Sequence, residues 1–185
     1  MVNTFGRQKY AGEIQWIAPA GSEKVKGCVF RARREFDYNH LAENPIIYIA
    51  AESYYALYFN GEHIGSGPAR GTENCNFLDV YNVAEYLRKG RNIIAVEVFC
   101  NNFGTFMAAP SQPALFIKTG NFVCDDKWQV QIAQEYRTAD VPDYTPQIGL
   151  MEWRDLRKSP RGWQLFNDLS QWLAAEVIDK NRKIY

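Results

Sequence analysis

The stretch "LYFNGEHIGSG", residues 57–67, constrains the fold more than any other part of the sequence. Apolar residues alternate on both sides of Asn60-Gly61, and a period of two is typical of strands. Asn-Gly tolerates the positive φ angles of a type I′ turn, so we expect a β-hairpin here. No helix follows that could present backbone amides to a phosphate, which argues against a phosphate-binding loop. We expect Gly65 and Gly67 to let the return strand leave the sheet.

The first two thirds of the chain carry further strand signals. Residues 28–36 alternate between two faces, with Arg31 and Arg33 on one face and Phe30 and Ala32 on the other. Other short runs predict strands at residues 45–53, 93–99, 113–120 and 128–136, and the first of these is apolar enough to be buried on both faces.

One helical turn interrupts this pattern. Asn82 can cap a turn at residues 83–88, and Gly90 can end it. Regular short strands with a single helical turn predict an all-β chain, folded as an antiparallel β-sandwich rather than as alternating βαβ units.

The pattern changes after Arg137, where prolines interrupt regular structure. We therefore expect residues 1–137 to form the sandwich domain and residues 138–185 to form an irregular tail packed on it. The end of this tail has two interpretations. Either Asp168 caps a helix, or residues 172–178 form a strand.

The charge balance excludes some classes of partner. The chain has 21 Lys and Arg against 21 Asp and Glu, so its formal net charge is zero. This argues against a nucleic-acid footprint and against a patch for anionic membranes. No apolar run approaches the roughly 20 residues that cross a bilayer. We expect neither nucleic acid nor a membrane as a partner. The aromatic share of 15% is high and indicates β structure, a stacking surface or both.

The cysteines and histidines supply few metal ligands. Cys28, Cys75, Cys100 and Cys124 are far apart and form no CxxC pair, which argues against zinc, and we predict no bound metal. Buried or isolated thiols are favoured, and the spacing leaves a disulfide open.

Four segments, taken in order, resemble one protein family. They are "IAAESYYALYFNGEHIGSGPA", "LDVYNVAEYLRKGRNIIAVEV", "DDKWQV" and "MEWRDLRKSPRGWQLFNDLSQWLAA". The set resembles the N-terminal β-sandwich domain of bacterial α-L-rhamnosidases, which shows "Y.LYLNGK.VG", "YDVT..L..G.N.I.V", "TD.SW" and "GE.YDAR....GW....FDDS.W". The resemblance runs from Trp16 to Trp172 and implies a jelly-roll sandwich of the galactose-binding-like type.

Most matched positions suit turns, caps and anchors of the tail. Those for which we expect structural roles are Asn60, Gly61, Trp128, Asp155, Arg157, Trp163 and Trp172. We expect Asp155 and Arg157 to form an ion pair that holds the tail to the sandwich. The chain departs from the family at "CNNFGTF", residues 100–106, where rhamnosidases commonly have a glycine and tryptophan loop. It also has Trp153-Arg154 in place of a tyrosine-bearing pattern.

The resemblance implies a non-catalytic accessory domain of an α-L-rhamnosidase-like glycoside hydrolase. Its partners would be the catalytic domain of the parent chain and a rhamnose-containing glycan, to whose recognition it would contribute. No cofactor is implied; related sandwiches hold a structural calcium ion, which no residue pattern here indicates. The compartment would follow the parent, periplasmic or extracellular where it is exported and cytoplasmic otherwise.

Sugar sites pair an aromatic ring with planar polar groups, because one sugar ring has both an apolar C–H face and polar hydroxyls. Loop residues of these types are our candidate sugar-binding residues: Tyr54, Tyr55, Arg70, Asn74, Asn101, Asn102 and Phe103. An independent carbohydrate-binding module is therefore the alternative to an accessory domain.

A free-standing hydrolase is the third hypothesis. Glycoside hydrolysis needs two carboxyl groups across one bond, and the local candidates are Asp125 with Asp126 and Glu152 with Asp155. Adjacent residues of a strand point to opposite faces, so we expect caps and ion pairs there and no catalytic residue in this chain. Trp153, where exposed, would mark the surface that meets a catalytic domain.

Overall fold

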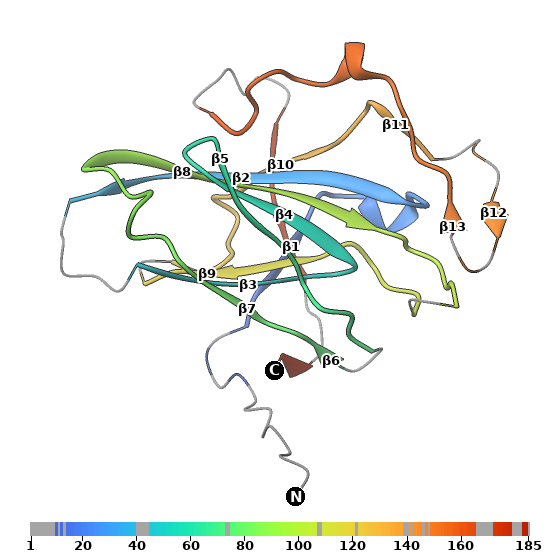
Figure 1. Cartoon of the computed structure of the whole chain (residues 1–185), viewed down its shortest axis with the longest axis horizontal. Helices are drawn as coiled ribbons and strands as arrows, with labels where there is room; N and C mark the ends of the chain where they lie inside the picture. Colours follow the sequence, from blue (N-terminus) through green and yellow to red (C-terminus); the bar gives the residue numbers. More distant parts are fainter. Residues whose placement is uncertain are drawn as a thin grey trace, which may run out of the picture.

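The fold is an antiparallel β-sandwich, as predicted (Figure 1). The computed structural model describes residues 10, 12, 14–39, 45–72, 75–106, 109–120, 122–138, 141, 143–145, 147, 149–165, 172–178 and 183–184. Its strands form two main sheets that lie face to face, and every strand pair within them is antiparallel.

The larger sheet is built around its two longest strands, which pair along their whole length. In spatial order its six strands are β15 (Leu173–Ala174), β10 (Gln129–Ile132), β2 (Cys28–Tyr38), β8 (Gly90–Cys100), β4 (Tyr54–Phe59) and β5 (Glu62–Gly67). Strand β2 turns Phe30 and Ala32 into the sandwich because successive side chains of a strand point to opposite faces. Arg31 and Arg33 therefore lie on the outer face.

The smaller sheet lies below the larger one in Figure 1. In spatial order its five strands are β16 (Glu176–Ile178), β1 (Trp16–Ala18), β9 (Leu115–Lys118), β3 (Ile46–Ala51) and β7 (Asp79–Asn82). Short elements complete the described structure: β6 (Cys75–Asn76) with β17 (Lys183–Ile184), β11 (Tyr136–Arg137) with β14 (Trp153–Arg154), β12 (Asp143–Thr145) with β13 (Gly149–Leu150), and the 3₁₀ turns η1 (Ser22–Lys24) and η2 (Leu156–Lys158).

The smaller sheet is covered on both faces. Ile49 of β3 belongs to the main core between the sheets, together with Leu57 and Val96 from the larger sheet. The next residue, Ala50, packs on the outer side with Phe116 in a second apolar cluster. The prediction that residues 45–53 contain a strand buried on both faces is thus confirmed.

The predicted hairpin is formed by β4 and β5. Asn60 and Gly61 both have positive φ angles, 50° and 88°, as a type I′ turn requires. The expectation for Gly65 and Gly67 is wrong, because both stay paired with β4. Side chains of β7 lie against these glycines instead, at a distance that leaves no room for a Cβ atom.

Asn60 also holds the neighbouring loop through its side chain. Its amide donates to Asn92 Oδ1 and to the carbonyl of Tyr86, both at 2.9 Å, and its Oδ1 accepts from the backbone N–H of Ile93 at 3.0 Å. Asn92 is fully buried and in turn bonds both backbone groups of Arg88. The two asparagines thus satisfy the polar backbone of a loop that closes one end of the core.

The predicted helical turn is present between β7 and β8. Asn82 Oδ1 accepts from the N–H of Ala84 at 3.0 Å, and the N–H of Leu87 bonds the carbonyl of Val83 at 3.2 Å. Gly90, with a φ of 85°, follows the turn.

The tail contributes strands to both main sheets. Strand β15 pairs with β10, and β16 pairs with β1, so residues 173–178 close one edge of each sheet. This agrees with the strand interpretation of the segment, and Asp168 lies outside the described residues. Residues 153–165, which include η2, cross above the larger sheet (Figure 1).

Replacing Asn60 by glycine separates its two roles. Glycine keeps the positive φ without strain but removes the amide, so the N–H of Ile93 loses its acceptor and the carbonyl of Tyr86 loses this donor. We expect Asn60→Gly to lower the free energy of unfolding by about 2 kcal/mol, measured by urea denaturation. Asn82→Ala, which removes one exposed cap bond, should cost about 1 kcal/mol. Wild-type stability in Asn60→Gly would show that only turn geometry matters.

Candidate functional site

A cleft of about 420 Å³ opens at one end of the sandwich. It lies between the start of β4, the loop after β5, the end of β8 and the tail, and its lining includes Tyr54, Arg70, Asn101, Tyr136, Leu150 and Trp153. Small-molecule sites commonly have volumes of roughly 300–1,000 Å³, with apolar walls and a few polar groups. The cleft therefore has the size and composition of a ligand site.

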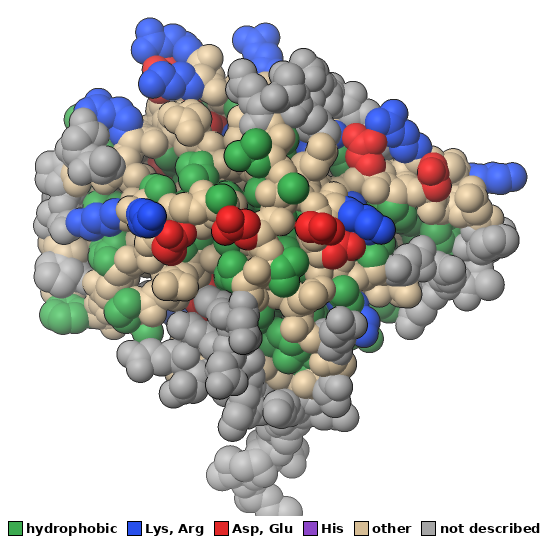
Figure 2. Space-filling view, turned by 180° about the vertical axis from the view of Figure 1, so that it is seen from behind, with side chains coloured by type: hydrophobic (Ala, Val, Ile, Leu, Met, Phe, Trp, Pro, Cys, Tyr) green, Lys and Arg blue, Asp and Glu red, His purple; other side chains and the backbone are tan. Residues whose placement is uncertain are grey.

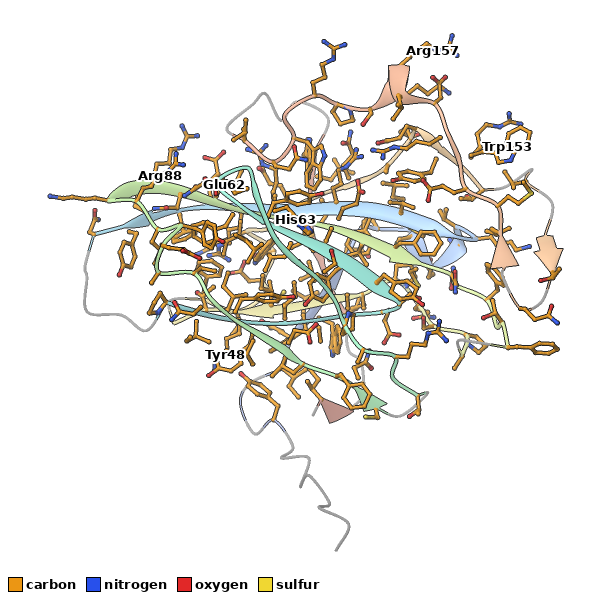
Figure 3. The ribbon with its side chains drawn as sticks, viewed as in Figure 1. Tyr48, Glu62, His63, Arg88, Trp153 and Arg157 are labelled. Carbon is orange, nitrogen blue, oxygen red and sulfur yellow. The ribbon has the colours of Figure 1, made fainter. Side chains whose placement is uncertain are left out.

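The tail supplies one wall of this cleft. Strand β14 pairs with β11, so that Trp153 lies opposite Arg137, whose guanidinium carbon is 4.9 Å from the indole ring. Trp153 is 45% exposed, and Met151 beside it in sequence is 43% exposed. Figure 3 shows Trp153 at the periphery of the tail, away from the two sheets.

Tyr54 and Arg70 form the rim on the sandwich side. Arg70 Nε donates to the Tyr54 hydroxyl at 3.3 Å, and both side chains are exposed. The same two residues line a second, smaller recess of about 50 Å³. This recess lies between the β3–β4 corner and the loop that leads from β5 to β6.

Two buried polar side chains line the recess. Glu52 is 3% exposed and Asn76 is 5% exposed. Asn76 Nδ2 donates to Glu52 Oε1 at 3.2 Å, whereas Asn76 Oδ1 has no hydrogen-bond partner within the described part of the protein. A buried acceptor without a hydrogen bond lowers the stability of the fold by about 1–3 kcal/mol, so a donor from outside the described residues is expected here.

The sequence interpretation missed both of these residues. Glu52 directly follows the apolar strand β3, and a charged residue at the end of a buried strand is a signal that could have been used. Asn76 gave no local signal, because only the tertiary fold brings β6 beside the end of β3.

The structure brings three of the predicted sugar-binding residues to the cleft. Tyr54, Arg70 and Asn101 all line it. Asn74 lies outside the described residues.

The other three predicted sugar-binding residues have different surroundings. Tyr55 is wrong as a surface candidate, because it is buried in the core and its hydroxyl lies 2.5 Å from Asp79 Oδ2. Asn102 uses its amide to bind the carbonyl of Glu23 at 2.6 Å, which fixes the loop around η1. Phe103 does not line the cleft; the ammonium of Lys26 lies 5.0 Å from its ring.

A buried ionic cluster holds the tail on the larger sheet. Arg31 is fully buried; its guanidinium lies 2.8 Å from Glu97 of β8 and is paired on its other side with Glu135, in the turn before β11. Arg154 of β14 reaches the same Glu135 carboxylate at 3.5 Å. Because Trp153 is the neighbour of Arg154, this cluster also sets the position of the cleft wall.

The three tryptophans expected to be structural, Trp128, Trp163 and Trp172, lie in or over the larger sheet. Trp128 is fully buried in the core. Trp163 covers Arg31, whose guanidinium carbon is 4.9 Å from the ring, and Trp172 lies 5.6 Å from that of Arg33. Neither arginine was expected to be buried.

The proposed role of Asp155 and Arg157 needs a correction. Two hydrogen bonds of 2.8 Å join their charged groups, and Asp155 also caps η2. The hydrogen bonds from Arg157 lower the pKa of Asp155 to about 2. Both residues belong to one surface turn, however, so the pair cannot hold the tail to the sandwich. Arg154 and Trp163 of the tail do so instead, through Glu135 and Arg31 of the sandwich.

The four cysteines are thiols that form no disulfide. Cys28 and Cys100 lie opposite each other on β2 and β8. Burial, with the neighbouring Cys100 sulfur, raises the pKa of Cys28 to about 12, so this thiol is protonated at neutral pH. Within the described ranges, no three His, Cys, Asp or Glu side chains gather as a metal site.

The surface is electrostatically mixed. Figure 2 shows basic and acidic side chains interspersed over one face of the molecule, in line with the zero net charge. No helix among the described residues is long and apolar enough to span a membrane.

The sheets and the cleft define the chain as an all-β, antiparallel sandwich domain with a ligand-sized opening at one end. A lectin from Pleurotus ostreatus, solved in complex with GalNAc, shares the fold with a TM-score of 0.50 and 16% identity over 92% of this chain and 45% of the lectin chain. No family model and no curated protein matches the chain.

Rhamnosidases give a closer structural match. A GH78 family rhamnosidase of Bacillus sp. GL1 is 28% identical, with a TM-score of 0.80 over 92% of this chain and 18% of the enzyme. The α-L-rhamnosidase from Dictyoglumus thermophilum is 23% identical, with a TM-score of 0.68 over 94% of this chain and 22% of the enzyme. The predicted resemblance to a β-sandwich domain of α-L-rhamnosidases is confirmed. The chain spans about a fifth of the length of these two enzymes.

Acid should weaken the ionic cluster. Burial alone would raise the pKa of Glu135, but the hydrogen bonds and charge of Arg31 outweigh it and lower that pKa below 4.5. A depressed folded pKa adds stability above the unfolded value, and this is lost as the pH falls through the folded value. Glu135→Gln should cost about 3 kcal/mol at neutral pH and should flatten the loss of stability below about pH 4.5. Urea denaturation across pH measures both.

Glu62→Gln is the matched control for this substitution. Glu62 lies 3.9 Å from Arg88 in an exposed pair on the hairpin side (Figure 3), so its loss should change stability by less than about 1 kcal/mol. Equal effects of the two substitutions would contradict the role assigned to the cluster.

Proposed function

We propose that this chain is a non-catalytic accessory domain of an α-L-rhamnosidase-like glycoside hydrolase. One observation carries the proposal: 92% of the chain superposes on 18% of a GH78 rhamnosidase at 28% identity. A match of this kind is what one domain of a multidomain enzyme gives. The parent reaction would be the hydrolysis of terminal α-L-rhamnose.

The tail offers a surface on which such a domain could pack against its catalytic partner. Met151, Trp153 and Leu156 are exposed apolar side chains on one segment, and Leu156 is 68% exposed. Interfaces between domains bury such residues, and tryptophan is enriched at their centres. Trp153 also lines the cleft, so the same contact would complete a wall of a sugar site.

Sugar recognition in the cleft is the finer part of the proposal. Tyr54 supplies an aromatic ring, while Arg70 and Asn101 supply planar polar groups around the same opening. This combination matches the two faces of a sugar ring. A carbohydrate-binding module that acts alone is the second candidate function, and the existence of the cleft within this chain favours it.

Docking is tested with Trp153→Ser in the enzyme that carries this chain and a catalytic domain. We expect the sandwich to unfold in a separate transition at lower temperature in calorimetry, because the apolar contact that couples the two domains is lost. Leu173→Ser, which also removes an exposed apolar side chain but on β15, is the control and should leave the coupling intact. Unchanged coupling in Trp153→Ser would refute the packing surface.

Sugar recognition is tested on the isolated chain by titration with a rhamnose-containing oligosaccharide. Binding should change tryptophan fluorescence, because Trp153 lines the cleft, and Tyr54→Ala should weaken affinity about tenfold by removing the ring. Phe106→Ala, at an exposed ring outside the cleft lining, should bind like wild type.

Two results would separate the functions. Absence of any response at millimolar sugar would remove sugar recognition and leave the docking role. Release of nitrophenol from an aryl rhamnoside by this chain, lost in Asp155→Ala, would overturn the non-catalytic role.

A further inference from the structure

The side-chain amide of Asn76 has an orientation that its neighbours fix. Nδ2 donates to Glu52 Oε1 at 3.2 Å and to the carbonyl of Ala51 at 3.5 Å. Exchanging the nitrogen and oxygen would set Oδ1 against two acceptors, so only this orientation is favourable. The carbonyl oxygen therefore faces away from Glu52 and Ala51, and Asn76 lines the recess.

That oxygen needs a donor which the described part of the protein does not supply. Asn76 is 5% exposed, and its Oδ1 is buried without a hydrogen-bond partner. Buried acceptors in folded proteins are almost always satisfied by protein, water or ligand. The recess, at about 50 Å³, has room for one or two polar groups of a ligand but not for a whole sugar ring.

The acceptor groups that line the recess determine which ligand groups can bind there. Its lining includes Asn76 and Glu52, whose side chains are nearly fully buried and carry hydrogen-bond acceptors. These acceptors favour hydroxyl donors at the buried end of the recess. At the rim, the Tyr54 ring and the Arg70 guanidinium connect the recess to the larger cleft, where the rest of a sugar ring has space.

We infer that the recess receives the hydroxyl-bearing edge of a neutral sugar, with Asn76 Oδ1 accepting a hydrogen bond from one ligand hydroxyl. Tyr54 then lies beside the C–H face of the ring, and the remainder of the glycan extends into the cleft. This inference rests on the sugar-recognition part of the proposed function. It assigns the specificity for the sugar hydroxyls to Asn76 and Glu52, which are not among the sugar-binding residues predicted from the sequence.

The test is a titration of the whole ¹⁵N-labelled chain with methyl α-L-rhamnopyranoside, followed by NMR. The side-chain NH₂ signals of Asn76 should shift in step with the backbone signals of Tyr54 and Arg70, because all three surround the bound hydroxyls. Sodium D-glucuronate at the same concentrations should bind at least about tenfold more weakly, since its carboxylate would face Glu52.

Asn76→Ala should weaken binding of the neutral sugar about tenfold by removing the acceptor. Asn82→Ala is the matched control, because Asn82 caps a turn and lines neither cavity, and its affinity should equal that of wild type. The substitution at Asn76 also removes the donor to Glu52. Should that variant fail to fold, the wild-type titration decides alone.

Three outcomes would overturn the inference, each with a different consequence. Shifts at Asn101 and Trp153 without Asn76 would keep sugar recognition but move it to the cleft. Shifts of Asn76 with calcium chloride alone, and none with sugar, would make the recess a cation site. No response to any sugar would remove sugar recognition as a whole, while the accessory role would still be decided by the docking experiment.

Discussion

The burial of the Arg31 guanidinium is the constraint on which the rest of the structure depends. Removing such a charge from water costs several kcal/mol unless opposite charges and hydrogen bonds replace the solvent. Here the compensation comes from two chain segments, Glu97 on the neighbouring strand and Glu135 before the tail, with the Trp163 ring above. The tail adds to this compensation, because the Trp163 ring covers the guanidinium and Arg154 reaches the Glu135 carboxylate, and this contact positions the cleft wall.

The loop that closes the core and the loops that surround the cavities lie at different ends of the sandwich. At one end of the sandwich, the side-chain amides of Asn60 and Asn92 form hydrogen bonds with each other and with loop backbone groups, and not with a ligand. At another, the loops around Tyr54 and Arg70 surround two cavities, and one acceptor there has no partner among the described residues. The hairpin of residues 57–67, which best predicts the fold from the sequence, thus has a structural role. Ligand recognition would use Tyr54 and Arg70, which the hairpin positions at its other end.

Local chemistry explains which features could be predicted. The Asn60-Gly61 turn, the Asn82 cap and the strand faces follow from neighbours in sequence, so the pattern reveals them. Arg31 and Arg33 read as solvent-facing residues of a strand, and their burial depends on Glu135 and Trp163, more than a hundred residues away. Asn76 likewise lies beside Glu52 only because the fold brings β6 next to the end of β3. Pairings of this kind leave no periodic trace in a single sequence.

The position of β15 and β16 has a consequence for biosynthesis. These two strands come last in sequence among the strands of the two main sheets, and they close the β10 edge of one sheet and the β1 edge of the other. A growing chain would therefore carry two open sheet edges until residue 178 has left the ribosome, and open edges are templates for pairing with other chains. Both sheets can therefore be completed only after residue 178 has been synthesised, although the strands that they complete lie much earlier in the sequence.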